Sequence, residues 1–421
     1  MFPSIRTPDR PIRVGWTLRK SAASTGLDSR SASGNEVKVT LRFDYALVGG
    51  GLQNGLITLA LRHARPDARI VMVERGSRVG GNHTWCFHAG DVAHELATWI
   101  EPLVSLQWPG YDVAFPAHTR RLDSAYAGVT SERLAACVTR ALDVPGSRLF
   151  LDTTAIEVAA DHVMLRTTAG ETSRIDATVV VDARGPDAGP QTACGWQKFL
   201  GQELVLDRPH GLERPMLMDA TVAQLDGFRF VYVLPLAADR LLVEDTYFSD
   251  GAYLDVGELR TRIQEYVTDR AWSVTRVDRE EVGVLPLPWR YQLPPTNAPL
   301  LAGYAGGWFH PVTGYSFPIA ARLAAFVAAR EPTDVFGPAL VAHARMHARQ
   351  LAFALRLNRM LFHWFAPADR YHVLERFYRL PEAVIQRFYA LAMVPMDRAR
   401  ILIGRPPSGL SLRHMLRGQA S

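Results

Sequence analysis

The sequence has little cysteine and no long uncharged apolar run. The 421 residues include three cysteines, Cys86, Cys137 and Cys194, which are widely spaced and form no CxxC pair. This spacing argues against a disulfide framework and a zinc site, and it fits a reducing compartment. No apolar stretch approaches the ~18 residues of a membrane-spanning helix, and the N-terminus lacks the apolar segment of a signal peptide. We therefore expect no transmembrane helix, no signal peptide and no bound metal.

Charge is distributed unevenly along the chain. Residues 1–42 carry eight basic and three acidic side chains, and residues 339–421 carry thirteen arginines, no lysine and four acids. The segment between them holds 26 basic and 35 acidic residues. An acidic body with basic ends suits contact with an anionic surface, either a membrane or a nucleic acid. The alternative is a set of solvated arginine-rich helices. Because no recognised nucleic-acid module is present, we expect no nucleic-acid partner.

The stretch that begins near residue 43 has the order strand, tight turn, helix, strand and acid. A short apolar run, Tyr45–Val48, leads into the glycine turn Gly49–Gly51, and an apolar segment without proline follows. A second short strand, Arg69–Val73, ends in Glu74. Glycines let the backbone approach a pyrophosphate, a helix N-terminus offers it free N–H groups, and the acid accepts hydrogen bonds from a ribose. The order predicts a dinucleotide site; the alternative is a tight turn without a ligand.

Later segments predict a mixed α/β architecture. The continuous apolar run Ala177–Asp182 is typical of a parallel strand that is buried on both faces. Phe228–Leu234 alternates in side-chain type and is followed, after a polar turn, by Leu241–Asp245, which predicts a hairpin in an antiparallel sheet. Residues 299–330 have the pattern strand, glycine-rich loop, helix. Residues 339–396 are predicted to be helical, with interruptions at two prolines.

Three local sequences resemble the signatures of bacterial lycopene β-cyclases: GGNHTW at Gly80–Trp85, LLVEDT at Leu241–Thr246 and FHPVTGYSFP at Phe309–Pro318. The similarity extends from about residue 43 to about residue 396. The resemblance implies an α/β fold, with a Rossmann-like FAD-binding domain of the glutathione-reductase type, an antiparallel-sheet substrate domain and C-terminal helices. It also implies FAD, NAD(P)H as the source of electrons, and lycopene or a related acyclic carotenoid as substrate. The implied reaction converts ψ-ends to β-rings without net redox change.

Two positions depart from common patterns of this fold. Asn54 stands where the third glycine of the fingerprint is expected, and Gly55 follows it. Many flavoproteins of the fold have an Asp after the glycine of the last loop, where it holds the ribityl chain, whereas Tyr304 follows Gly303 here. The cyclases generally lack that Asp too, so its absence does not exclude FAD, and the ribityl contact stays unassigned.

The sequence predicts four regions. Residues 1–42 are expected to form a disordered basic tail. Residues 43–189 and 276–338 are expected to form a discontinuous FAD-binding domain, into which the antiparallel-sheet substrate domain, 190–275, is inserted. Residues 339–421 are expected to form the C-terminal helical region.

The resemblance assigns the cofactor site to the glycine turn, the acid after the second strand, the VVDARG strand end and the late glycine-rich loop. By fold analogy, backbone N–H groups near Thr313–Tyr315 point at the flavin and, with the helix dipole, stabilise its anionic reduced form. The predicted cofactor-binding residues are Gly49, Gly50, Gly51, Glu74, Arg75, Asp182, Gly185, Gly303, Thr313, Gly314 and Tyr315.

Cyclisation of a ψ-end requires a positioned acid, because a proton must be delivered to the C1=C2 double bond. Glu244 and Asp245 are the candidates, since burial at the end of an apolar strand would keep a carboxyl protonated. Adjacent strand residues point to opposite faces, so both reach one pocket only where the strand ends or bulges. We favour Glu244 as the donor and Asp245 as its orienting group or charge balance. The alternative is an arginine-paired acid duo that closes the strand.

The site must also tolerate positive charge, and aromatic faces within about 6 Å of a cation contribute on the order of 0.5–2 kcal/mol. We expect two or three of the aromatic candidates to line the substrate tunnel and the others to be core. His83 and His310 are acid–base candidates, or structural histidines. The predicted substrate-lining residues are Trp85, Phe228, Phe230, Tyr232, Trp308, Phe309 and His310.

The C-terminal helices interleave arginines with aromatic residues, as in Arg376, Phe377, Tyr378 and Arg379. This pattern favours a monotopic membrane surface at the tunnel mouth, which would place the protein peripherally on the cytoplasmic face of a membrane. The alternative is a helix packed on the FAD domain with its arginines pointing outward. Two other functions stay open: a flavin monooxygenase or prenyl reductase of the same fold, and a non-catalytic prenyl-binding protein.

Overall fold

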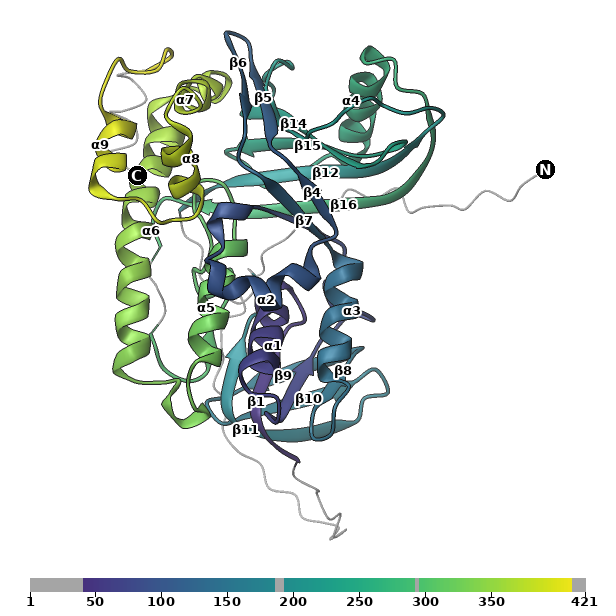
Figure 1. The fold of residues 1–421 in the computed structure, drawn as a ribbon, viewed down its shortest axis with the longest axis vertical. Coiled ribbons are helices and arrows are strands. Elements are labelled where there is room, and N and C mark those ends of the chain that lie inside the picture. Colours follow the sequence, from purple (N-terminus) through teal and green to yellow (C-terminus); the bar gives the residue numbers. More distant parts are fainter. Residues whose placement is uncertain (1–40, 186–192, 292–294, 411–421) are drawn as a thin grey trace, which may run out of the picture.

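The computed structural model describes residues 41–185, 193–291 and 295–410, which form two large sheets with helices around them (Figure 1). The predicted tail lies outside these residues apart from its last two positions, and so does the stretch after residue 410. Within the described part of the chain, no helix combines the length and the apolarity needed to cross a membrane. All three cysteines are free thiols.

The first sheet has seven strands and carries the βαβ unit. Its order is β8-β2-β1-β11-β10-β9, with β17 paired to β11, and the pairs around β1 are parallel. The apolar run predicted as a doubly buried parallel strand is the end of β11, next to β1, so that prediction is confirmed. The strands are β1 Leu41–Val48, β2 Ile70–Val73, β8 Arg148–Phe150, β9 Thr153–Val158, β10 His162–Thr167, β11 Thr172–Asp182 and β17 Leu300–Leu301.

The second large sheet also has seven strands, in the order β16-β12-β15-β14-β13-β5-β6. The predicted hairpin is confirmed, because β14 and β15 pair antiparallel with Phe228 opposite Phe248 and Tyr232 opposite Glu244. The strands are β5 Tyr111–Phe115, β6 His118–Leu122, β12 Cys194–Leu206, β13 Met216–Asp219, β14 Phe228–Ala237, β15 Arg240–Ser249 and β16 Val274–Pro288. A small third sheet holds β3 Thr84–His88, β4 Leu106–Trp108 and β7 Tyr126–Thr130.

The predicted domain boundaries differ from the sheets in two places. The boundary at residue 276 falls inside β16, which pairs with β12 along the substrate sheet. The hairpin β5–β6, from within the predicted FAD-binding segment 43–189, extends the same sheet through β13. Both differences arise because strand pairing joins segments that are distant in the sequence, and no local pattern reports such pairing.

Helices cover both sheets. In Figure 1, α1 and α5 lie beside the first sheet, α4 covers the outer face of the second sheet, and α6 runs along one side of the molecule. The helices are α1 Leu52–Ala64, α2 Ala97–Ile100, α3 Ser131–Leu142, α4 Val256–Asp269, α5 Phe317–Ala328, α6 Pro338–Trp364, α7 Tyr371–Phe377, α8 Glu382–Tyr389 and α9 Pro395–Leu402. Short 3-10 turns occupy η1 Ala89–Asp91, η2 His94–Leu96, η3 Glu101–Leu103, η5 Pro332–Asp334 and η6 Pro367–Asp369.

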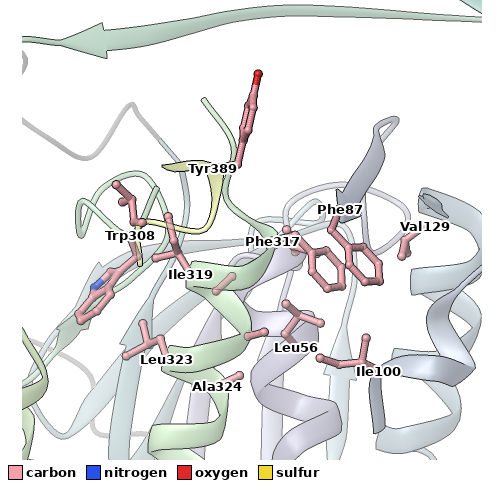
Figure 2. Close-up of a cluster of buried hydrophobic side chains, with 14 of the residues drawn as sticks. Leu56, Phe87, Ile100, Val129, Trp308, Phe317, Ile319, Leu323, Ala324 and Tyr389 are labelled. Carbon is pink, nitrogen blue, oxygen red and sulfur yellow. The ribbon is translucent and has the colours of Figure 1, made fainter. Parts of the chain in front are cut away.

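The N-terminal ends of α1 and α5 share a buried apolar cluster (Figure 2). Phe87 of β3 and Phe317, the first residue of α5, stack with ring centroids 4.1 Å apart. Leu56 of α1 and Ile100 of α2 belong to the same cluster and are buried. Aromatic stacking and burial of this area from water therefore fix where α5 begins relative to the small sheet.

The C-terminal helices are docked onto the substrate sheet by buried polar groups. Asn358 of α6 donates from Nδ2 to the carbonyl oxygens of Leu287 and Pro288, at 2.8 Å each. The Arg370 guanidinium is almost fully buried and donates to Phe248 O at 3.2 Å. Because these donors would be unsatisfied if the helices moved away, the C-terminal region forms part of the folded unit rather than a loose appendage.

Candidate active site

The glycine turn after β1 adopts a backbone that only glycine accommodates well. Gly49 has φ +93°, and a Cβ atom there would lie 2.7 Å from Ala183 O. Gly50 N donates to Glu74 Oε2 at 2.6 Å, and Gly76 N donates to Glu74 Oε1 at 2.7 Å. The acid that ends β2 therefore orders the turn from the neighbouring strand.

The displaced third glycine has a structural explanation. The Asn54 amide donates to Val48 O at 2.9 Å and to Gly49 O at 2.8 Å, which ties the first turn of α1 to the end of β1. Helix α1 packs closely against α3 at Gly55, one position after Asn54. A Cβ atom on Gly55 would lie 3.0 Å from a methyl carbon of Leu134 on α3. The two roles are thus divided between an asparagine and a glycine.

The late glycine-rich loop closes onto the same region, but not as predicted. Thr313 N and Gly314 N both donate to His310 O, at 3.3 Å and 2.9 Å. Tyr315 N lies 3.4 Å from Thr313 Oγ1. The N–H groups that were predicted to point at a flavin are therefore engaged inside the turn, and the first turn of α5 begins directly after them.

A cavity of about 530 Å³ joins the glycine turn to the inner face of the substrate sheet. Most of the predicted cofactor residues and four of the predicted substrate-lining residues border this cavity. The predicted residues that line it are Gly49, Gly50, Gly51, Glu74, Arg75, Gly185, Gly303, Thr313, Gly314, Tyr315, Trp85, Phe230, Tyr232, Trp308 and Glu244. A second cavity of about 290 Å³ continues past Glu74 and Arg75 toward Thr153 and Arg184.

Five predicted site residues do not border the main cavity, because their side chains are engaged elsewhere. Asp182 forms an ion pair with Arg184, in which Oδ2 and Nη2 are 2.7 Å apart. Phe228 packs on Phe248 and Phe309 stacks on Tyr304, both in the core. The residues outside the cavity lining are Asp182, Phe228, Asp245, Phe309 and His310.

The two histidines considered as acid–base groups differ in position. His310 is fully buried, its Nδ1 accepts from Val312 N at 3.2 Å, and burial lowers its pKa to about 3. A group with so low a pKa is neutral at neutral pH and cannot act as the acid. His83 lines the cavity, and burial also lowers its pKa.

Glu244 faces the cavity together with a second carboxyl group that sequence patterns did not reveal. In the sheet register, Gly201 of β12 lies opposite Glu244 of β15 on one side and opposite Glu281 of β16 on the other. The two carboxyl groups are hydrogen-bonded to each other above Gly201. Burial raises the pKa of Glu244 to about 7 and that of Glu281 to about 8, and the neighbouring carboxylate raises the pKa of Glu281 further.

The GGNHTW motif holds this second carboxyl group in place. Thr84 N donates to Glu281 Oε2 at 3.1 Å. Arg279 donates from Nη2 to Thr84 Oγ1 at 2.8 Å, and its Nη1 lies 3.9 Å from Glu281 Oε2. The Asn82 amide donates to Glu280 O on the same strand. The one sequence signal for Glu281 was its position in an acidic pair that enters the apolar end of β16.

Asp245 points away from the cavity. Its carboxylate accepts two hydrogen bonds from Arg229, with Nε to Oδ1 at 2.8 Å and Nη2 to Oδ2 at 3.1 Å. Tyr247 OH donates to Oδ2 at 2.9 Å. The strand neither ends nor bulges at this point, so the alternation of β15 sends Glu244 and Asp245 to opposite faces. The geometry matches the arginine-paired alternative rather than a direct orienting contact with Glu244.

A cluster of tyrosines and His88 form another wall of the cavity; Tyr232 and Tyr315 were among the predicted site residues, whereas Tyr126 and the His88–Asp91 pair were not. His88 and Asp91 are buried, with Nδ1 and Oδ2 3.1 Å apart, and Tyr315 OH donates to the same Asp91 oxygen at 2.7 Å. Tyr126 OH and Tyr232 OH lie 3.1 Å apart. These contacts keep the hydroxyl groups satisfied and present ring surface to the cavity.

Solved structures with a similar fold are flavoprotein-like. A p-nitrophenol 4-monooxygenase from Pseudomonas putida DLL-E4 superposes with a TM-score of 0.59 at 15% identity, covering 83% of this chain and 98% of that one. A geranylgeranyl bacteriochlorophyll reductase-like protein from Thermoplasma acidophilum gives 0.58 at 12% identity, covering 90% and 96%. PqsL, a probable FAD-dependent monooxygenase from Pseudomonas aeruginosa, gives 0.54 at 17%, covering 78% and 98%. The fold and the nucleotide-type site define this class, an α/β protein with a Rossmann-type FAD-binding fold.

Within that class, the chain belongs to the lycopene cyclase family. The family model described as lycopene cyclase protein matches residues 44–415. The lycopene beta-cyclase of Pantoea ananas is 43% identical over 380 residues, covering 87% of this chain and 95% of that protein. Those of Pseudescherichia vulneris and Paracoccus sp. (strain N81106 / MBIC 01143) are 42% and 40% identical, each covering 86% of this chain and 94% of theirs. Membership of this family makes the protein an enzyme, as the sequence resemblance implied.

Proposed function

We propose that this enzyme is a lycopene β-cyclase that converts the ψ-ends of lycopene to β-rings by proton-initiated cyclisation. One observation carries the proposal: a single cavity is lined at one end by the glycine turn Gly49–Gly51 and at the other by Glu244. A nucleotide cofactor and a protonated carboxyl group would therefore border the same cavity. The names of the curated relatives support the same substrate.

FAD fits the residues present. Gly49 lets the turn pack against Ala183, Gly51 leaves open space for a pyrophosphate, Glu74 stands at the ribose position, and the second cavity past Arg75 provides space for an adenine. Gly303, Gly314 and Tyr315 would hold the flavin end near α5. When bound in its reduced, anionic form, FAD supplies negative charge beside a carbocation, and we propose NAD(P)H as the external reductant that maintains this form.

Gly49→Ala is expected to abolish FAD binding, because the added methyl group would meet Ala183 O at 2.7 Å and φ +93° is strained for alanine. The measurement is flavin absorbance per mole of purified protein. Gly170→Ala is the matched control, since Gly170 has φ +86° but open space around its Cβ position. A Gly49→Ala protein that retains the wild-type amount of flavin would contradict this cofactor assignment.

Glu244 is the proposed proton donor. Its protonated carboxyl delivers a proton to C2 of the ψ-end, which leaves a tertiary cation at C1. The C5=C6 π bond attacks C1 and forms the C1–C6 bond, so that the positive charge moves to C5. Loss of the C6 proton then forms the C5=C6 double bond of the β-ring. No atom is gained or lost over the sequence, in agreement with a reaction that needs no net oxidant or reductant.

The walls of the cavity protect the cation from water. Trp85, Phe230, Tyr232 and Trp308 contribute aromatic surface, and Tyr126 OH is already paired with Tyr232 OH. Ring faces stabilise a nearby cation. Burial beside these aromatic walls also favours the protonated form of the Glu244 carboxyl.

The direct test is expression in a host that accumulates lycopene, followed by chromatography and mass spectrometry of the pigments. The expected product has one or two β-rings and the same mass as lycopene. A hydroxylated or hydrogenated product would instead indicate a monooxygenase or a reductase. An unchanged pigment profile with flavin-loaded protein would overturn the proposal.

We also propose that the enzyme lies peripherally on the cytoplasmic face of a membrane, where its apolar substrate resides. The proposed contact surface is the outer side of α6 and α9. Two hydrogen bonds hold these segments together: Gln350 Nε2 donates to Met393 O at 3.0 Å, and Arg398 Nη2 donates to Gln350 Oε1 at 3.1 Å. The surface combines exposed apolar residues with exposed arginines, a pattern that suits anionic lipid. The residues of this surface are Arg345, Met346, Arg349, Val394, Met396, Arg400, Leu402 and Ile403.

The double variant Met396→Glu/Ile403→Glu is expected to weaken binding to phosphatidylglycerol vesicles roughly tenfold or more, because it removes two exposed apolar side chains and adds charge that anionic lipid repels. Co-sedimentation measures the bound fraction. Val277→Glu, which changes an exposed valine on β16, is the control. Equal binding by the double variant and wild type would place the membrane contact elsewhere.

A further inference from the structure

The carboxyl pair occupies a position that three strands define jointly. Glu244 and Glu281 lie on the strands that flank β12, and both are in register with Gly201. A Cβ atom on Gly201 would lie 3.0 Å from Glu281 Cγ and 3.4 Å from its Oε1. The missing side chain at this one position therefore lets two glutamates from non-adjacent strands meet above the sheet.

The remaining contacts of the pair are asymmetric. Thr246 Oγ1 donates to Glu244 Oε1 at 2.5 Å, whereas Glu281 accepts from the backbone N–H of Thr84. Among the described residues, the cation that lies near the pair is Arg279, whose Nη1 is 3.9 Å from Glu281 Oε2. The Thr84 N–H and the Arg279 guanidinium lower the pKa of Glu281 against the effect of burial, so a state with Glu281 ionised and the shared proton on Glu244 is accessible to the pair.

We propose that Glu281 is the catalytic base of this reaction. Glu281, rather than Glu244, removes the C6 proton, and this proton then returns to Glu244 along the hydrogen bond between the two carboxyl groups. The inference rests on the proposed cyclase function. In each turnover Glu244 loses a proton to C2, Glu281 gains one from C6, and transfer within the pair restores the starting state. No proton has to come from or leave to the solvent, so the cycle closes inside the cavity.

The chemistry of the ring fits two carboxyl groups held side by side. C2, which gains a proton, and C6, which loses one, are both bonded to C1 once the ring has closed. An acid and a base that serve these two atoms must therefore be neighbours. The meeting of Glu244 and Glu281 above Gly201 meets this requirement, whereas Asp245, on the opposite face of β15, does not.

The base also decides which ring forms. A cation at C5 loses a proton from C6 to give a β-ring, from C4 to give an ε-ring, or from the C5 methyl group to give a γ-ring. A carboxylate fixed beside C6 selects the first of these. Ring type is therefore a readout that a merely structural role of Glu281 would not change.

The test is Glu281→Gln in purified, FAD-loaded enzyme with reductant and lycopene. We expect turnover to fall about 100-fold, as removal of a general base does, and ε- or γ-rings to appear among the remaining products. Glu280→Gln is the matched control: it makes the same change one residue earlier on β16, where the side chain bonds Gln202 and Arg260 outside the cavity. Glu281→Gln enzyme that makes only β-rings at the wild-type rate would overturn the proposal.

Gly201→Ala provides a second variant that keeps both carboxyl groups. Its methyl group pushes Glu281 away, so we expect slower turnover and an activity loss that begins at higher pH, because the hydrogen bond with Glu281 that lowers the pKa of Glu244 is lost. An unchanged rate and pH profile would count against the pair. Failure of the proposed function is distinguishable: wild-type enzyme would then form no rings at all, whichever residue occupies position 281.

Discussion

Glu244→Gln abolishes ring formation: this is the expected result with the largest effect on activity. Glutamine has nearly the same shape as glutamate but no proton acidic enough for an alkene, so the first step has no donor. Loss of a general acid costs on the order of 10²–10⁴ in rate. The measurement is the rate of β-ring formation by the purified variant, with flavin absorbance as the check that the nucleotide site is intact.

The pH dependence of the wild-type enzyme follows from the same group. Burial raises the pKa of Glu244 to about 7, so the protonated, active form predominates below this pH and is lost as pH rises through it. The acidic form is also the one that the folded protein favours. Stability from this group is therefore fully present below the unfolded pKa of 4.5, declines as pH rises toward 7 and is lost above it. We expect a rate that falls between pH 7 and pH 9, and a weaker pH dependence of stability in Glu244→Gln.

Two outcomes would contradict the assignment of Glu244. Ring formation by Glu244→Gln within tenfold of wild type would place the acid elsewhere in the cavity. A wild-type rate that rises steadily to pH 9 would show that the ionised carboxylate, not the acid, is the active form. Neither outcome would affect the FAD assignment, which the Gly49→Ala experiment tests separately.

Asp245→Asn is expected to have the largest effect on stability, because it leaves the Arg229 guanidinium buried without a counter-charge. The two side chains are 0% and 7% exposed, and the pair is bidentate. Removing one partner of such a buried pair costs about 3–5 kcal/mol. Urea unfolding, followed by tryptophan fluorescence, measures the change. We expect the protein that remains folded and flavin-loaded to keep its rate of β-ring formation.

A double variant separates stability from catalysis at this position. Replacing both partners, as in Arg229→Met/Asp245→Leu, removes the unpaired charge and is expected to recover much of the lost stability. If Asp245→Asn instead unfolds like wild type but makes no rings, Asp245 acts in the chemistry, as the adjacent acidic pair in the sequence first indicated.

Local sequence patterns predicted the parts of the site that lie on one continuous segment. The glycine turn, the helix after it and Glu74 are neighbours in a βαβ unit, so their order alone indicated a nucleotide site. The hairpin of β14 and β15 was predictable for the same reason, since a short turn and alternating side chains fix its register. Glu244 could be proposed as the acid because it stands in a motif on one of these strands.

Residues close together in the chain thus sufficed to predict the fold class, the nucleotide turn and Glu244 as the proposed acid. That Glu281 faces Glu244, and that Asp245 does not, is visible only in the folded chain. The first depends on β12 entering the sheet between β15 and β16, with a glycine at the shared register. The second depends on β15 continuing without a bulge, so that neighbouring side chains take opposite faces. Pairing between distant strands is set by packing of the whole sheet, and no single segment carries that information.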